Sequence, residues 1–251
     1  PDVCPTLEEL TIDATAVSSD IASGKTAYAR GMKLVGNMSP IKIDVESNGI
    51  RLATSTFESI PDVFDFSNLI YADNMLVNCI NLKTIENLDL HNAESADSMC
   101  ANCSDLQNVT NCNFQSLKIA RAMFSFCGKL VNINGSTFES LTNTELMFTD
   151  CPLLESVSGI DFTNVTTANN MFIRCSSLEN ISNTTQISCS LYLGDSPLLS
   201  VEDAVNSILR NLVDLTGKAS QKITFDTALQ SSISESEIQA ATDKNWVISI
   251  S

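Results

Sequence analysis

One unit recurs at a fixed step of 24 residues between residues 75 and 181 of this 251-residue chain. Each copy reads M-x-x-x-C-x-x-L-x-x-[IV], with no insertion between copies. The methionines and cysteines are Met75, Met99, Met123, Met147 and Met171, and Cys79, Cys103, Cys127, Cys151 and Cys175. A constant period of this length is typical of a solenoid, in which equivalent residues of successive coils stack. The sequence therefore predicts ladders of buried Met, Cys, Leu and Ile or Val side chains along one elongated core.

Other positions of the repeat follow the same step. A small residue stands three positions before each methionine, as expected where coils approach closely: Ala72, Ala96, Ala120, Thr144 and Ala168. A leucine or phenylalanine stands 15 positions after the first four methionines: Leu90, Phe114, Phe138 and Phe162. One step before Leu90 lies Phe66, which predicts a degenerate coil ahead of the first clear one. In the fifth coil Thr184 and Gln186 occupy apolar positions, so we expect the stack to begin closing there.

The segments that flank the repeats have different patterns. Before the repeats, residues 28–30 and 33–35 predict one hairpin. Residues 41–45 alternate in polarity before a turn at 47–49 and a return strand at 50–52, which predicts a second hairpin. The segment that begins at residue 41 would cover the open end of the first coil, because an exposed edge of stacked strands invites association.

The period changes again after residue 200. Apolar residues take the spacing of an amphipathic helix, which we expect to begin after Ser200, to end near Gly217 and to cover the last coil. They are Val201, Ala204, Val205, Ile208, Leu209 and Leu212. A strand, a short helix and a terminal strand follow at 222–225, 234–241 and 246–250. The sequence thus predicts a mostly β, α+β chain in three parts: an N-terminal module at 1–40, a solenoid with degenerate end coils at 41–200, and a helix-strand-helix-strand cap at 201–251.

Charge and hydropathy exclude several classes of partner. The formal net charge is −16 with 14 Lys plus Arg, so nucleic acid is not an expected partner, because phosphate binding needs clustered cations. An anionic membrane surface is disfavoured for the same reason. No run approaches the ~20 apolar residues that span a bilayer. The first residues lack the basic and apolar regions of a secretory leader, so we expect a soluble chain without membrane insertion.

The nine cysteines are expected to be packed thiols. Stacked strands lie close enough for neighbouring rungs to form a disulfide in principle. The odd number of cysteines and the small apolar character of the residue favour reduced, buried thiols, which suits a reducing compartment. Cys100 and Cys103 form a C-x-x-C, but no second pair and no nearby histidine completes a zinc set.

The sequence predicts no catalytic, cofactor or metal residue. His91 is the only histidine and lies in a polar turn, so an imidazole-dependent nucleophile would have to use it. Residues 23–26 read S-G-K-T but lack the preceding glycine of a phosphate loop. Calcium is the remaining alternative, because turns carry Asp62, Asp65, Asp89 and Asp161. No Asp-Gly loop pattern accompanies them, so no metal site is assigned.

Residues 165–178, V-T-T-A-N-N-M-F-I-R-C-S-S-L, resemble the units of BspA-like bacterial leucine-rich repeats, including those of the mycoplasma lipoprotein type. The resemblance covers about residues 64–200. It implies a leucine-rich-repeat solenoid of right-handed coils, used for recognition on cell surfaces or virions, and it implies no catalytic residues.

Residues 20–38 resemble a D-I-x-x-G-K-T-A-Y signature of bacteriophage tail and appendage proteins, which implies a small structural module of a virion. Together the two resemblances favour a non-enzymatic phage or prophage virion component. The partners expected are other virion proteins, or a protein or glycan on the host cell surface, with the oligomeric state left open. The alternative is a secreted bacterial cell-surface adhesin of the BspA-like type.

Overall fold

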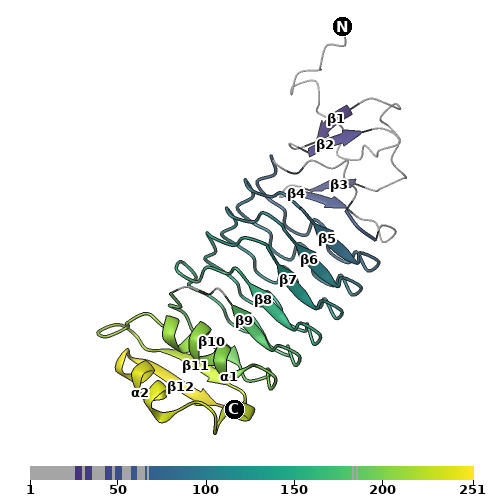
Figure 1. Ribbon diagram of the computed structural model, residues 1–251. Coiled ribbons are helices and arrows are strands. Elements are labelled where there is room, and N and C mark those ends of the chain that lie inside the picture. Colours follow the sequence, from purple (N-terminus) through teal and green to yellow (C-terminus); the bar gives the residue numbers. More distant parts are fainter. Residues whose placement is uncertain are drawn as a thin grey trace.

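A parallel sheet of five short strands runs along the molecule (Figure 1). The computed structural model describes residues 26–29, 32–35, 43–46, 49–52, 58–60, 66, 68–182, 184 and 186–251, with side chains from Leu52 onward. The strands are β5 (Thr84–Glu86), β6 (Asn108–Thr110), β7 (Asn132–Asn134), β8 (Ser156–Ser158) and β9 (Asn180–Ser182). Paired residues of neighbouring strands lie 24 positions apart, as in Ile85 with Val109. The described residues are therefore mostly β, consistent with the predicted solenoid.

The predicted ladders lie in one hydrophobic core. The Met, Cys, Leu and Ile or Val columns of all five coils are at most 2% exposed. Small residues three positions before each methionine are equally buried, with Thr144 at 0%. The side chain of Thr144 donates to the carbonyl oxygen of Thr167 in the next coil, at 3.4 Å, which explains how a hydroxyl is accommodated there. Phe66 is also buried, as the preceding degenerate coil requires.

Backbone hydrogen bonds join each coil to the next. The amide of Leu76 donates to the carbonyl of Met99 at 2.7 Å, and the equivalent bond from Phe124 to Met147 is 2.9 Å. Because these amides are satisfied by the neighbouring coil, the repeat forms extended segments and turns instead of helix. Each coil is thus stabilised mainly by its two neighbours.

Three turns in each of the first four coils, and two in the fifth coil as far as the structure describes it, place a residue in the left-handed backbone region. These residues lie one position before, three positions after and 12 positions after the methionine. Asn and Gly, which tolerate this region, fill many of the sites, but Ala122, Phe126, Leu146 and Arg174 also adopt it, with φ between 51° and 60°. The stack thus imposes the conformation even where the residue disfavours it.

Gly135 and Gly159, which lie 12 positions after a methionine, test this constraint. We expect Gly159→Ala to lower the free energy of unfolding by about 2 kcal/mol or more, because φ is +78° and the new Cβ would lie 2.7 Å from the backbone oxygen of Ser136. Gly135→Ala should cost only about 1 kcal/mol, because its Cβ would meet the movable side-chain oxygen of Asn111. Urea unfolding followed by circular dichroism measures both, and equal losses would contradict the role of the Ser136 carbonyl.

Two hairpins precede the stack, as predicted. Strand β1 (Thr26–Ala29) pairs antiparallel with β2 (Met32–Val35), and β3 (Ile43–Glu46) pairs antiparallel with β4 (Gly49–Leu52). The strands differ from the predicted bounds by one or two residues, and Gly49 belongs to β4 instead of the turn. Leu52 links the second hairpin to the first coil, since its amide donates to the carbonyl of Met75 at 2.7 Å.

A second, three-stranded parallel sheet follows the fifth coil. Its order is β10 (Leu191–Leu193), β11 (Gln221–Phe225) and β12 (Trp246–Ile250). A short 3-10 turn, η4 (Thr227–Leu229), and helix α2 (Glu235–Asp243), capped by Ser234, connect β11 to β12. These elements confirm the predicted strand, helix and terminal strand.

The helix expected after Ser200 is shorter and less regular than predicted. Ser200 caps it as expected, but it comprises α1 (Val201–Asp203), a π segment η2 (Ala204–Ile208) and a 3-10 segment η3 (Leu209–Asn211). It ends before Leu212, not near Gly217, because Leu212 becomes extended and pairs with Ile187.

The helical segment covers the last coil, as predicted. Ala204, Val205, Ile208 and Leu209 are buried there. The side-chain amide of Asn180 in β9 donates to the carboxylate of Asp203 at 2.8 Å. Thr184 of the fifth coil, polar at an apolar position, donates its hydroxyl to the carbonyl of Ser207. No helix among the described residues is both long and apolar enough to cross a bilayer.

Candidate functional site

The outward face of the β5–β9 sheet is almost free of charge. In each strand the middle residue is buried and the residues on either side point outward. Nine of these ten outward side chains are Asn, Ser or Thr, and the tenth is Glu86. We call this set the strand face: Thr84, Glu86, Asn108, Thr110, Asn132, Asn134, Ser156, Ser158, Asn180 and Ser182. It is conspicuous in a chain with 30 acidic residues.

Hydrogen bonds order the centre of the strand face. The side-chain amide of Asn132 donates to the side-chain oxygen of Asn108 in the preceding coil, at 3.1 Å. The Asn134 amide donates to Asn132 at the same distance. These bonds fix the side chains in a row and leave further donors and acceptors for a partner. The sequence carries the signal for this face, since Asn, Ser and Thr flank the Ile or Val ladder, but the repeat pattern alone did not predict a site there.

Charged side chains form pairs across coils away from the strand face. Lys118 pairs with Glu94 at 3.0 Å and Lys129 with Asp105 at 2.6 Å, each one repeat apart. Arg121 lies between Asp97 and Glu145, at 3.3 and 3.5 Å. Such exposed pairs contribute little to stability.

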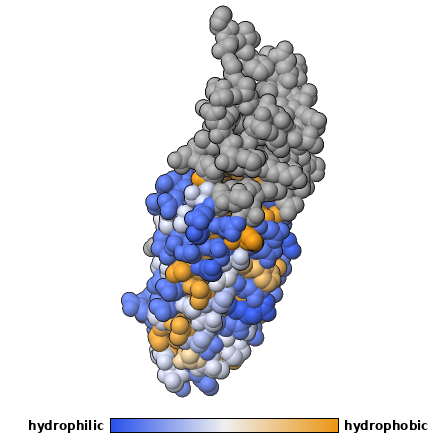
Figure 2. All heavy atoms as spheres, turned by 90° about the vertical axis from the view of Figure 1, so that its right-hand side faces the viewer, coloured by the Kyte–Doolittle hydropathy of each residue, from blue (hydrophilic) through white to orange (hydrophobic). Residues whose placement is uncertain are grey.

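Exposed apolar side chains are dispersed. Figure 2 shows one side of the molecule, on which hydrophobic patches are small and separated by hydrophilic surface. Among the residues whose side chains the structure describes, the exposed large apolar ones are Ile70, Tyr71, Ile80, Ile119, Phe126, Leu153, Leu198, Val201 and Val247. Singly exposed apolar residues are normal on a soluble surface and indicate no docking site by themselves.

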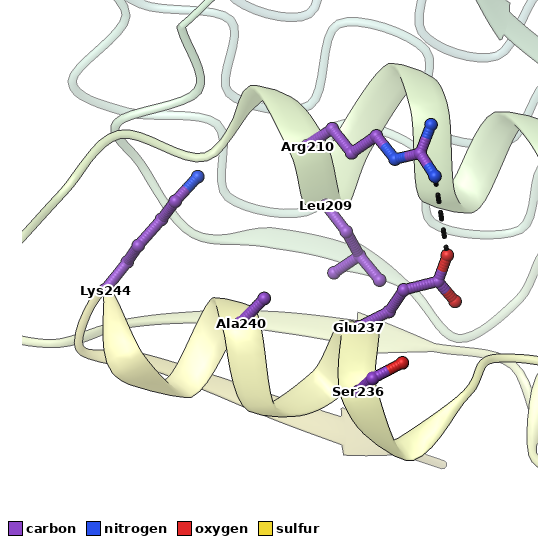
Figure 3. Close-up of a pocket in the computed structure, with 6 residues that line it drawn as sticks. All are labelled: Leu209, Arg210, Ser236, Glu237, Ala240 and Lys244. Atoms are coloured by element: carbon purple, nitrogen blue, oxygen red, sulfur yellow. Dashed lines mark ion pairs between the residues drawn. The ribbon is translucent and has the colours of Figure 1, made fainter.

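A cleft of about 230 Å³ lies between η3 and α2 (Figure 3). Leu209 and Ala240 provide its apolar wall, and Arg210 faces Glu237 across it at 3.9 Å. Glu237 also accepts hydrogen bonds from Ser234, and Lys244 donates to the carbonyl of Leu212 at 2.9 Å. The charged groups of this cleft therefore already serve the packing of the two segments.

A second, open cleft of about 510 Å³ lies where the fifth coil meets the β10–β12 sheet. Asn169, Asn170, Tyr192 and Lys222 contribute to its lining, with Glu145 at one side. This cleft could not be predicted from the sequence, because its walls come from segments that are distant in the chain.

The residues considered for catalysis and metal binding lie apart. The ring of His91 contacts the Asp89 carboxylate at 3.0 Å and the Asn92 amide at 2.8 Å in an exposed turn. Asp161 accepts from the amide of Thr163 at 2.9 Å in a turn of another coil. Asp62 and Asp65 lie outside the described residues. Within the described part of the chain, no three His, Cys, Asp or Glu residues form a group that could hold a metal ion.

The eight cysteines that the structure describes are buried free thiols, which confirms their packing in the core. Each ladder sulfur points at a carbonyl oxygen 27 residues earlier, at 3.1 to 3.4 Å, as in Cys127 with Cys100. Burial raises the pKa of the Cys151 thiol to about 12 and that of Cys112 to about 11. Protonated, buried sulfur is a poor nucleophile and a poor metal ligand. These thiols therefore contribute packing, not reactivity.

Comparison with known families places the repeats in one of them. Two overlapping segments, residues 52–138 and 82–185, match the family described as Mycoplasma protein of unknown function, DUF285, and together they span more than half of the chain. The match lies outside residues 20–38, so the resemblance of that segment to phage proteins gains no support from it. No curated protein and no solved structure matches the chain. The chain belongs to the DUF285 family and is a repeat protein of the mycoplasma type.

Proposed function

We propose that this protein is a non-enzymatic recognition protein of the cell surface, that its stack is of the leucine-rich-repeat class, and that it binds its partner through the strand face. The observation that carries the proposal is the neutrality of that face in a chain with a net charge of −16. Charged residues are depleted from the cores of protein interfaces, because they are costly to desolvate. Asn, Ser and Thr instead supply adaptable hydrogen bonds.

The rigidity of the stack supports the same proposal. The backbone under the strand face is bonded to the coil on either side, and the middle residue of each strand is anchored in the core. A preorganised surface loses little conformational entropy when a partner binds. An extended partner can therefore contact several coils in register.

A pair of matched variants tests the use of the strand face. The labelled 251-residue chain is applied to an array of extracellular proteins and glycans, and we expect binding to a subset. The double variant Asn132→Arg, Ser156→Arg should weaken that binding at least tenfold, since two guanidinium groups would occupy the face. The control Ser104→Arg, Gln115→Arg adds the same charge at exposed positions elsewhere and should bind like the unmodified chain. Equal losses in both variants, or no binding at all, would sink the proposal.

The location of the protein separates this proposal from its rival. A virion component remains the alternative and rests on residues 20–38, of which the structure describes strands β1 and β2. Protease treatment of intact source cells should release the repeat stack from the cell surface. Recovery of the protein in purified particles, with none removed from cells, would favour the virion.

A further inference from the structure

The cleft at the end of the stack has an unusual aromatic wall. Strand β10 takes the place of the next coil, since Leu191 follows Thr167 by one repeat. In the coils the residue after the Thr167 position is small and buried, as Ala168 is. Tyr192 is the equivalent residue in β10. In β10 the alternation is reversed: Leu191 and Leu193 are buried and Tyr192 points outward. A one-residue change of facing thus converts a close-packed core position into an aromatic surface.

The ring of Tyr192 is held in a fixed position. A Cβ added to Gly194 would lie 2.7 Å from Cζ and Oη of the ring, so the end of the ring lies close against Gly194. The Tyr192 hydroxyl donates to the carboxylate of Asp195 at 3.4 Å. Burial of the ring is only partial, which leaves part of it open to the cleft.

Polar groups around the ring are available to a ligand. The side chains of Asn169, Asn170 and Lys222 are exposed and make no hydrogen bond or ion pair with the described residues. The hydroxyls of Ser190 and Thr224 are already bonded, to Gln221 at 2.6 Å and to Ser249 at 3.0 Å. Two amides and one ammonium group therefore line the same cleft as the aromatic ring.

We propose that this cleft binds a neutral hexose ring, stacked on Tyr192 and hydrogen-bonded by Asn169, Asn170 and Lys222. A sugar ring presents C–H groups on one face and hydroxyls at its rim, which matches an aromatic wall with polar groups around it. The volume of the cleft, about 510 Å³, lies in the range of small-molecule sites. The net charge of −16 disfavours an anionic ligand, and Lys222 disfavours a cation.

Saturation-transfer NMR on the whole chain tests the site. The probes are the methyl glycosides of glucose, galactose, mannose and N-acetylglucosamine, with adenosine as an aromatic competitor. We expect transfer to at least one glycoside, at least a tenfold loss of affinity in Tyr192→Ala, and retention in Tyr192→Phe, which keeps the stacking face. Tyr71→Ala is the matched control, because Tyr71 is a half-exposed tyrosine near the other end of the repeats.

Each outcome decides the proposal. Transfer to none of the glycosides, transfer to adenosine alone, or unchanged binding in Tyr192→Ala would overturn it. If Tyr192→Ala does not fold, the surface variant Asn169→Ala, Lys222→Ala takes its place, and unchanged binding in that variant overturns the site. The strand-face variant Asn132→Arg, Ser156→Arg should bind the glycoside normally. Failure of the proposed partner recognition is therefore distinguishable from failure of this site.

Discussion

Replacing Phe148 by alanine is expected to lower the free energy of unfolding by about 3–5 kcal/mol. The ring is fully buried and lies between two others, with its centroid 5.8 Å from that of Phe124 and 5.6 Å from that of Phe172. Its removal leaves a cavity at the centre of the stack and ends both ring contacts at once. Urea unfolding monitored by circular dichroism measures the loss.

Phe126→Ala is the matched control for Phe148→Ala. Phe126 is a phenylalanine of the coil before Phe148, but it is 50% exposed at a turn, so its truncation should change the free energy of unfolding by less than about 1 kcal/mol. Because coils interact mainly with their neighbours, Phe148→Ala should also separate the unfolding of the two ends of the stack. Similar losses in the two variants would contradict the assignment of the three stacked rings as a stabilising column.

Raising the pH above 9 is expected to unfold the protein within about two pH units. Burial raises the pKa of Cys112 to about 11 and that of Cys151 and Cys189 to about 12. It also raises the pKa of Cys100, Cys127 and Cys175 above the usual value for a thiol. In the unfolded chain these thiols ionise near pH ~8.5. Above that pH the unfolded state loses protons that the folded state keeps, so stability falls as pH rises.

The size of this effect follows from the number of thiols. Each of the six lowers the folding equilibrium constant by about tenfold per pH unit until its own folded pKa is reached. Over about two pH units the six thiols together lower the free energy of unfolding by more than the roughly 5–15 kcal/mol that stabilises a typical domain. The measurement is the free energy of unfolding in urea between pH 8 and 11, with a reductant present.

A variant with fewer thiols controls the alkaline experiment. Cys112→Val with Cys189→Val should reduce the number of protons released on unfolding, given by the slope of stability against pH, from about six to about four. A stability that stays constant from pH 8 to 10.5 would show that the buried thiols do not govern alkaline unfolding.

Sequence patterns predicted the core and its connections well. The ladders through Met99 and Cys103 were readable because their period is constant and their residue types do not vary. The C-terminal strand at 246–250 was readable because a run of apolar and β-branched residues ends the chain. The end of the helix near Gly217 was predicted wrongly. Leu212 continues the helical spacing in sequence, but its bridge to Ile187 in the tertiary structure prevails.

Features that depend on three-dimensional context were not readable. Leu146 and Arg174 adopt left-handed backbone conformations that no property of leucine or arginine suggests, because the coils on either side impose them. The cleft beside Tyr192 depends on a reversal of facing in β10 and on β11, which lies about 30 residues further along the chain. The pairing of β10 with β11 leaves no periodic trace in the sequence.

The bonding of each coil to its two neighbours alone has a consequence for how this protein varies over generations. Removing or duplicating a whole unit at the DNA level would join surfaces that already fit, because every junction between coils uses the same columns. Gain or loss of a whole 24-residue unit would thus change the length of the stack while every junction keeps the same ladder columns. The length of the stack can therefore change without any change to the residues of the β10–β12 sheet at its end.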